Sequence, residues 1–488
     1  VDDIRTWRDN AVRTSWLNTL EPLARLPELF TAEANPDARA GLMAEAHDRL
    51  AKLGYERKAS LRFLYAATNP IGEECSRRDA LTISSAMADT LASDIEPWVD
   101  LWRDTYAFVA SRVAAGLRGL LKTAPLQNGA ITLPEFLQHC ATQKMSLQHH
   151  GVVALATIAF QEVKNAVREQ LASRGAAAEL QLTSDDCHVV RRKFEFERFE
   201  EYTYPSADLQ ISARSADAVR RGDYEWIVSE LHPPVAMLHH CFYWNCPDPA
   251  ALSAALSSTT AGKPNFHFGF FAADFTSHTA VRIFDALPNE SFFVAPERGD
   301  PSWQTILPAD AEVFIDESSG DVCLRKRRSD EFLGSFARAW LIPLGFHPFN
   351  FSLAPHTPRL RCGRAIVQRR AWTIRADELR EPRESGVTSD LIVAVEELRA
   401  ARELPRFIYI RPTEQALRRS GAEGRDKDTK PVYIDLESYL SIEIFYRWLR
   451  KAGEVEATEM LPDPDHLCWR KEDGRRTFEL RTLIVPRR

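Results

Sequence analysis

The spacing of apolar residues changes near residue 185, and this change limits the folds that the chain can adopt. Before it, segments 38–54 ("ARAGLMAEAHDRLAKLG") and 111–124 ("SRVAAGLRGLLKTA") place apolar residues at helical spacing. After it, segments 224–232 ("YEWIVSELH") and 311–317 ("AEVFIDE") alternate apolar and polar residues, as β-strands do. The pattern predicts an α+β protein, with a helical N-terminal region followed by strand-rich mixed α/β units. We divide the chain into a mainly helical region (1–180), a strand-rich α+β central region (181–403) and a small α/β unit with a C-terminal β-hairpin (404–488).

The C-terminal unit carries the clearest local signals. Segments 405–412 ("PRFIYIRP") and 430–438 ("KPVYIDLES") are predicted strands joined by a polar loop, and a helix is predicted over 439–453. Near the end of the chain, "HLCWRK" is one predicted hairpin arm, Asp473-Gly474 is the turn, and "RRTFELRTLIV" is the return arm. Asp-Gly between two alternating runs is the strongest short signal for a hairpin.

The composition excludes several classes of protein. The net charge of −7 argues against a chain that coats nucleic acid along its whole surface, although a mildly basic C-terminal part permits a local anionic partner. No apolar run approaches the roughly 18 residues of a membrane helix, and the N-terminus has no signal-peptide pattern. The eight cysteines lie without paired spacing, which favours reduced thiols. We therefore expect a cytoplasmic protein with no membrane partner.

The richest polar cluster lies in "SELHPPVAMLHHCFYWNC", which spans residues 229–246 and contains Glu230 and His232. Its histidines and cysteines are residue types that bind zinc, but structural zinc sites usually consist of two close pairs of ligands. The simpler interpretation is a strand end packed with aromatic residues, with Glu230 and His232 at its mouth. We predict no metal here, and a metal-dependent hydrolase built on this cluster is a distant alternative.

A second cluster lies in "HTPRLRCGRAIVQRRAW" (356–372), where arginines alternate with apolar residues as on one face of a strand. Guanidinium groups bind phosphates and carboxylates in a bidentate manner. The competing interpretation is a solvated strand face whose arginines pair with nearby Asp and Glu. The arginines are Arg359, Arg361, Arg364, Arg369 and Arg370.

Several of these segments resemble the tRNA-dependent half of the lantibiotic dehydratase family, and they follow one another in the family's order. They are "GEECSRRDA" (72–80), "PSADLQISA" (205–213), "RGDYEWIVSELHP" (221–233), "HTPRLRCGRAIVQRRAW" (356–372), and the group "PRFIYI", "KPVYIDLES" and "TEMLPDPDHLCWRKEDGRRTFELR". The resemblance covers residues from about 70 to 485.

The resemblance implies an aminoacyl-tRNA-dependent transferase of lanthipeptide-like natural-product biosynthesis. Such a module takes an amino acid from tRNA, its co-substrate, and places it on a ribosomally made precursor peptide; in dehydratases, glutamate goes to Ser and Thr side chains and a separate domain eliminates it. We expect this chain to lack the elimination domain and the family's N-terminal stretch, and to work with a separate elimination or downstream modifying enzyme. Two alternatives remain open: a peptide aminoacyl-tRNA ligase, which extends a peptide C-terminus with ATP, and a catalytically silent relative that holds peptide or tRNA.

Aminoacyl transfer starts from an activated ester, so the catalyst mainly positions the reactants and stabilises developing negative charge. Histidines and arginines at strand ends suit that task. We therefore expect Glu230, His232 and His356 to be catalytic, and we expect Glu230 and His232 to share a concave surface with residues 356–361. The tRNA-binding residues are predicted to be Arg359, Arg361, Arg364, Arg369 and Arg370.

Overall fold

The structure, a computed structural model, confirms the α+β class and divides by its internal contacts into two units. One unit consists of residues 1–80 with 275–281, and the other contains the rest of the chain. The described residues are 2–52, 71, 81–143, 152–175, 177–194, 205–232, 246–259, 265–268, 291–294, 305–337, 355–380, 388–419, 430–472 and 474–485.

The first unit is helical. It contains α1 (Asp2–Arg5), α2 (Asn10–Ala32) and α3 (Pro36–Lys52). The Asp9 side chain accepts a hydrogen bond from the Val12 backbone N–H and so satisfies one of the unpaired donors at the start of α2. Leu26 and Phe30 of α2 pack with Ala46 of α3 in a small core.

The second unit begins with helices, as the sequence predicts. The long helix α4 (Ser85–Lys122) packs against α6 (Val152–Ala172) and α7 (Ser184–Arg191), and α5 (Leu133–Thr142) follows the short strand β1 (Ala130–Thr132). The Ser84 side chain caps α4 by accepting from the Met87 N–H. Trp98 and Trp102 of α4 are buried in the main core.

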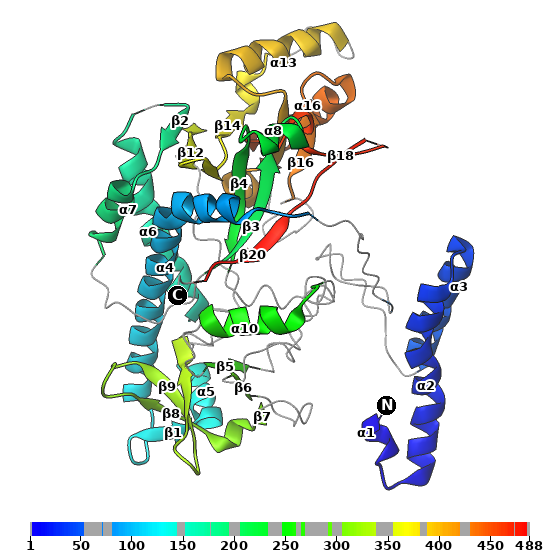
Figure 1. The fold of residues 1–488 in the computed structure, drawn as a ribbon. Coiled ribbons are helices and arrows are strands. Elements are labelled where there is room, and N and C mark those ends of the chain that lie inside the picture. The colour runs from blue at the N-terminus through cyan, green and yellow to red at the C-terminus, as the bar shows by residue number, and fades with distance from the viewer. Residues whose placement is uncertain are drawn as a thin grey trace. The chain divides into compact units, whose positions relative to one another are not determined.

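A six-stranded sheet, here called the central sheet, packs against α4 (Figure 1). Leu209, Trp226 and Leu360 point from it into the helical core. Side chains alternate along a strand, so the opposite face, here called the polar face, receives Asp208 and Arg359, the neighbours of Leu209 and Leu360. In order, the strands are β2 (Glu179–Gln181), β12 (Arg359–Cys362), β13 (Ala365–Gln368), β4 (Glu225–His232), β3 (Ser206–Ser212) and β20 (Leu480–Leu483).

A β-bulge in the central sheet changes which residues of β4 reach the polar face. Asp208 pairs with Glu230, but the next residue of β3 pairs with Val228, so Ser229 is the extra residue. Val228 and Leu231 both lie in the core although they are three residues apart. The bulge therefore leaves Glu230, and His232 two residues later, on the same face as Asp208.

A five-stranded sheet and the helices that pack on it have a separate core, which includes Trp372, Ile408 and Phe445. Helices α13 (Thr388–Arg402) and α16 (Tyr439–Ala452) contribute to that core, and Gly453 ends α16 with a φ of 75°. The strands, in order, are β11 (His356–Thr357), β14 (Ala371–Arg375), β17 (Glu454–Glu459), β15 (Phe407–Pro412) and β16 (Val432–Asp435).

One detail of this region differs from the sequence-based expectation. The segment predicted as a loop after β15 begins with a helix, α14 (Glu414–Arg419), in which Ala416 is buried. Its apolar residues are too few to give a helical pattern by themselves. Strand β14, which precedes residue 404, belongs to the five-stranded sheet, and α13 contributes to its core. The domain boundaries stay a prediction.

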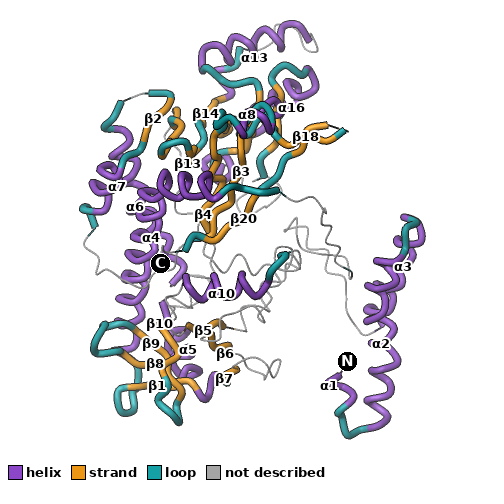
Figure 2. The backbone as a smooth tube through the Cα atoms, viewed as in Figure 1, coloured by secondary structure: helices purple, strands orange, loops and turns teal. Residues whose placement is uncertain are grey.

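The C-terminal hairpin is present, but its return arm is shorter than predicted. Strand β18 (Trp469–Lys471), which is labelled in Figure 2, pairs with β19 (Gly474–Arg476). Lys471 lies opposite Gly474, so the turn begins one residue earlier than predicted. Gly474 has a φ of 134°, whereas Asp473 lies outside the described residues. The return arm predicted as one strand splits, because β20 leaves the hairpin and pairs with β3. Alternation along one segment does not reveal which strand it will pair with.

Among the described residues, no helix is long and apolar enough to cross a membrane. The remaining elements form two smaller sheets and several helices. The chain turns between Ile315 and Val322, which lie opposite each other at the ends of β8 and β9. One sheet has the strand order β1, β8 (Ala311–Ile315), β9 (Val322–Lys326) and β10 (Phe332–Ser335), and the other has the order β5 (Asn265–Phe268), β6 (Ser291–Val294) and β7 (Thr305–Ile306). The helices are α8 (Ala216–Arg220), α10 (Pro249–Thr259) and the 3-10 helices η4 (Pro308–Asp310), η5 (Ala376–Glu378) and η6 (Pro464–His466).

Replacing Gly363 by alanine should destabilise the second unit. Gly363 lies between β12 and β13 with a φ of 55°, and a Cβ there would overlap the Asp94 carboxylate of α4, which accepts the Arg364 backbone N–H at 3.0 Å. The left-handed backbone alone costs about 1–2 kcal/mol in a non-glycine residue. Urea unfolding should show a loss at least this large, whereas Gly119→Ala, in an open helical position of α4, should be neutral or stabilising. A Gly363→Ala variant as stable as the wild type would contradict this packing.

Candidate functional site

The polar face of the central sheet brings together five charged side chains from three adjacent strands, here called the β3–β4–β20 cluster. It consists of Asp208 on β3, Glu230 and His232 on β4, and Glu479 and Arg481 at the start of β20. Asp208 lies opposite Glu230 in one strand pair and opposite Arg481 in the other. The cluster therefore depends on the register of both strand pairs.

Asp208 is the centre of the cluster. Its side chain is only 4% exposed, and its Oδ2 accepts a hydrogen bond from Arg481 Nη2 and lies 2.9 Å from His232 Nε2. A buried carboxylate is costly unless cations and donors surround it. Arg481 and His232 supply both, so the position of Asp208 fixes the positions of its two neighbours. Its other oxygen, Oδ1, is buried and receives no hydrogen bond from the described part of the chain.

His232 lies between two carboxylates. Its Nε2 is 2.9 Å from Asp208 Oδ2 and 3.1 Å from Glu230 Oε2. Burial by itself would lower the pKa of His232, but the hydrogen bonds to Asp208 and Glu230 and the charges of both carboxylates outweigh it and raise the pKa to about 9. At neutral pH, His232 is therefore an imidazolium that is able to donate a proton.

Glu479 is the most accessible carboxylate of the cluster, with a side chain 44% exposed. Its Oε1 lies 3.6 Å from Arg481 Nη2. Partial burial and the charge of Asp208 raise the pKa of Glu479, and Arg481 and His232 oppose that shift. The cluster thus combines an imidazolium with a carboxyl group whose pKa is raised, which is a pairing that acid–base catalysis uses.

Three members of the cluster also form a possible set of metal ligands. Asp208, Glu230 and His232 offer ligand atoms that lie within 4.8 Å of one another. Two carboxylates and an imidazole suit a divalent transition metal. However, the proton of His232 and the guanidinium of Arg481 already balance these carboxylates, so the contacts do not require a metal. That this site works without a metal stays a prediction.

Arg359 and Arg361 lie on the polar face as predicted, and carboxylates hold both. Arg359 donates to Glu459 through Nε and Nη2 at 2.9 and 2.6 Å, and its Nη1 lies 3.1 Å from Glu179. Arg361 lies between Glu179, at 2.7 Å, and Glu225. Glu459 is nearly buried, and its hydrogen bonds raise the pKa of Arg359. Through Glu459, Arg359 joins the central sheet to the five-stranded sheet.

The three remaining predicted arginines have different surroundings. Arg364 is exposed and donates from Nη1 to the Gly222 carbonyl at 3.2 Å. Arg370 places its guanidinium 4.9 Å from the centre of the Trp372 ring. Arg369 donates from Nη2 to the Leu461 carbonyl at 2.8 Å, and burial lowers its pKa.

Arg369 is the predicted arginine that lies beside the cluster. Its Nη2 is 3.3 Å from the hydroxyl of Ser229, which is the bulged residue of β4. The charges of Glu230 and Glu479 partly oppose the effect of burial on its pKa. No ion pair joins Arg369 to a carboxylate within the described ranges, and its Nε is buried without a hydrogen-bond partner there.

The structure brings Glu230 and His232 together but places His356 on the other sheet. His356 belongs to β11, and its ring lies 5.7 Å from that of Trp372. Burial and the charge of Arg370 lower the pKa of His356, so its imidazole is neutral at pH 7. Its ring neighbour Trp372 belongs to β14 of the same five-stranded sheet. The catalytic roles of all three residues stay predictions.

Sequence reasoning missed Asp208, Glu479 and Arg481. Each lies in an alternating segment, "SADLQIS" or "FELRTL", whose apolar members predict a strand. Alternation places Glu479 and Arg481 on one face of their own segment. The pairing of β20 with β3 then brings that face to Asp208. Residues 233–245, which contain the other histidines of the cluster considered for zinc, lie outside the described residues.

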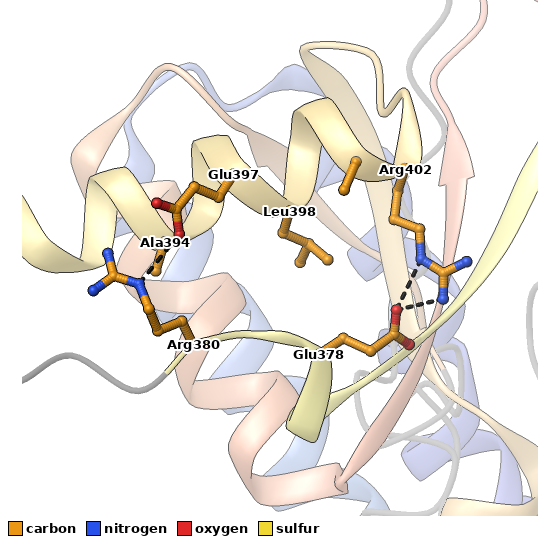
Figure 3. A pocket seen from close by; sticks show the side chains of 7 residues that line it. Glu378, Arg380, Ala394, Glu397, Leu398 and Arg402 are labelled. Atoms are coloured by element: carbon orange, nitrogen blue, oxygen red, sulfur yellow. Dashed lines mark hydrogen bonds and ion pairs between the residues drawn. The ribbon is translucent and has the colours of Figure 1, made fainter.

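A separate small cavity of about 240 Å³ lies beside α13 (Figure 3). Two ion pairs stand at its ends: Arg380 Nε is 3.1 Å from Glu397, and Arg402 Nε is 2.8 Å from Glu378. Leu398 lies between them on the helix. The cavity contains none of the predicted site residues.

Comparisons with known proteins agree with the resemblance seen in the sequence. The family model described as "Lantibiotic dehydratase, N terminus" matches residues 336–419, which confirms that resemblance. The solved structure of the glutamylation domain of TbtB from thiomuracin biosynthesis is similar to this chain, with a TM-score of 0.61 and 14% sequence identity over 95% of this chain. The same domain bound to 5′-phosphodesmethylglutamycin matches with a TM-score of 0.52 and 17% identity over 81% of this chain.

The likeness to these structures is a likeness of fold. The match covers 57% of the first solved chain and 50% of the second, so this chain spans little more than half of their length. No curated protein matches the sequence significantly.

The stability of the protein should depend on pH through His232. Because folding raises the pKa of His232 from 6.5 to about 9, its stabilising contribution is complete below pH 6.5 and is lost as the pH rises to 9. The free energy of unfolding should fall across this interval, and His232→Gln should flatten the fall. His188→Gln, on the exposed side of α7, should keep the wild-type dependence. An unchanged pH dependence in His232→Gln would contradict the imidazolium assignment.

Removing the guanidinium of Arg359 should destabilise the fold, because it leaves Glu459 buried without its main cation. Breaking a buried ion pair in this way costs about 3–5 kcal/mol. The control is Arg375→Ala, which removes an exposed pair with Asp377 and should leave the free energy of unfolding close to that of the wild type. Equal stability of the two variants in urea would show that Arg359 does not join the sheets.

Proposed function

We propose that this protein transfers glutamate from glutamyl-tRNA to Ser or Thr side chains of a ribosomally made precursor peptide. The observation that carries the proposal is the likeness of fold to the TbtB glutamylation domain over 95% of this chain. The match of residues 336–419 to the N-terminal model of lantibiotic dehydratases supports it. The protein is then an aminoacyl-tRNA-dependent transferase of lanthipeptide-like antibiotic biosynthesis.

The β3–β4–β20 cluster has the chemistry that such a transfer needs. The attack of a hydroxyl on the glutamyl ester builds negative charge on the carbonyl oxygen and releases a ribose oxygen that takes up a proton. We assign the donation of that proton to His232, which Glu230 and Asp208 hold in its charged form. His356 remains a third catalytic candidate, because its neutral imidazole can accept a proton.

We propose that tRNA meets the arginines of segment 359–370. Phosphate contacts supply most of the affinity for a nucleic acid and make binding fall with salt. Arg359, Arg361 and Arg370 already contact carboxylates, so tRNA would have to compete for them. Arg364 is the most accessible of the five, and Arg369 lies nearest the catalytic cluster. We therefore expect Arg364 to contact a phosphate of the tRNA backbone and Arg369 to contact the acceptor end of the tRNA.

The proposed reaction also implies which molecules the protein works with and in which compartment of the cell. The partners are a precursor peptide, tRNA, and a separate elimination or downstream modifying enzyme, because a glutamylated Ser or Thr is the substrate of an elimination. The reaction is proposed to take place in the cytoplasm, where charged tRNA is present. A peptide ligase that adds the amino acid to a C-terminus would in addition need ATP.

The phosphate role of Arg364 can be measured in a titration with bulk tRNA at several salt concentrations. Arg364→Ala should reduce the slope of log affinity against log salt by about 0.7–0.9, which corresponds to one phosphate contact. The control is Arg327→Ala, which removes an exposed arginine that pairs with Glu312 outside the central sheet. A slope for Arg364→Ala equal to that of the wild type would exclude the contact.

The transferase activity can be tested directly. Purified protein is incubated with glutamyl-tRNA and a precursor peptide, and tandem mass spectrometry should find glutamyl groups on Ser or Thr without added ATP. His232→Gln should reduce the rate about 100-fold or more, the contribution typical of a positioned acid. An amino acid joined to the peptide C-terminus only when ATP is present would instead identify a ligase, and no adduct at all would overturn the proposal.

A further inference from the structure

The three carboxylates of the β3–β4–β20 cluster differ in how far their oxygens are already engaged. Asp208 is nearly buried, and its Oδ2 contacts both Arg481 and His232. Glu230 has Oε2 at 3.1 Å from His232. Glu479 has one close polar neighbour within the described ranges, Arg481, and the distance of 3.6 Å is too long for a hydrogen bond. Glu479 is therefore the carboxylate whose oxygens are available to a substrate.

We propose that Glu479 is the general base that removes the proton from the acceptor hydroxyl of the peptide. This inference rests on the proposed function and adds a residue and a role to it. Glu479 is exposed enough to meet a peptide side chain, and the charge of His232, the imidazolium that the transfer uses as an acid, acts on it. A general base must reach the proton that it abstracts. Asp208 is too buried for this, and Glu230, although 40% exposed, is already paired with His232 through Oε2 at 3.1 Å.

The fold holds Glu479 in a fixed position. Its neighbours Phe478 and Leu480 pack against the main core, and Leu480 pairs with Leu209 of β3. Alternation then directs Glu479 to the polar face, as it does Arg481. Glu479 directly precedes β20, and because both of its neighbours are anchored in the core, it is positioned more accurately than a group on a free loop.

The surrounding charges and partial burial together raise the pKa of Glu479. The groups whose charges act on Glu479 are Asp208 from β3, Glu230 and His232 from β4, and Arg481 from β20, while the pKa of Arg369 in turn depends on Glu479. Burial and the neighbouring carboxylates favour the protonated form, whereas Arg481 and His232 favour the ionised form. A carboxylate with a raised pKa is a stronger base than a free one.

The proposed step conserves atoms and charge. The hydroxyl oxygen of Ser or Thr bonds to the ester carbonyl carbon while its proton passes to the Glu479 carboxylate. The bond between that carbon and the ribose oxygen then breaks, and the ribose oxygen takes a proton from His232. Proton exchange between Glu479 and His232, directly or through water, restores both groups. The products are a glutamyl ester of the peptide and uncharged tRNA, and no further reactant is consumed.

The test is a single-turnover measurement of glutamyl transfer at several pH values. The wild-type rate should rise with pH as Glu479 loses its proton. Glu479→Gln should lower the rate about 100-fold or more and remove this rise, while the affinities for tRNA and peptide change less than about threefold. Glu479→Asp, which keeps the carboxylate, should recover part of the rate. The control is Glu472→Gln, an exposed residue at the turn of the β18–β19 hairpin, which should behave as the wild type.

The outcomes separate this inference from the function on which it rests. A wild type that transfers glutamate, together with a Glu479→Gln variant within threefold of its rate, overturns the role of Glu479 and leaves the function intact. A wild type that transfers no glutamate overturns both. Thermal unfolding of Glu479→Gln should match that of the wild type, because the side chain is exposed. A structural role would instead show as a lower melting temperature, together with a transfer rate that neither Glu479→Asp nor a change of pH restores.

Discussion

The contacts of Asp208 with His232 and Arg481 determine how the charged side chains are arranged on the polar face of the central sheet. One nearly buried carboxylate joins side chains from β4 and β20 to β3, so that three strands share a single electrostatic centre. Without cations, Asp208 would be too costly to bury. With them, it fixes the position and charge of His232. The acid–base chemistry that we assign to the polar face depends on this one group.

The arginines of segment 359–370 show how the same residues can serve a fold and a function. Arg359 reaches across to Glu459, so an ion pair joins the central sheet to the five-stranded sheet, and Arg370 also meets Glu459 through its backbone N–H. Arg369 instead lies beside the bulged Ser229, without a carboxylate partner in the described part of the chain. Arg359 and Arg370 thus connect the two sheets through Glu459, whereas Arg369, between them in the sequence, lies near the β3–β4–β20 cluster.

The sequence predicts the class of fold because apolar spacing depends only on local periodicity. The helical pattern of residues 111–124 lies within α4, and the alternation of "YEWIVSELH" becomes β4. The same alternation placed Glu230 and His232 at one strand end. It did not identify Asp208 or Arg481, because the contacts of Asp208 with His232 and with Arg481 depend on which strands pair and on a bulge at Ser229, neither of which a single segment encodes. His356 was grouped with Glu230 and His232 for the same reason, although it lies on the other sheet.

The central claim is that Asp208 and Glu230 keep His232 charged at neutral pH, and the most direct test is an NMR titration of its imidazole. In the wild type, the ring signals should titrate with a pKa of about 9. In Asp208→Asn, which removes the buried charge, the pKa should fall, because burial then acts against fewer opposing groups. A wild-type pKa near the ordinary value of 6.5, unchanged in Asp208→Asn, would contradict the account.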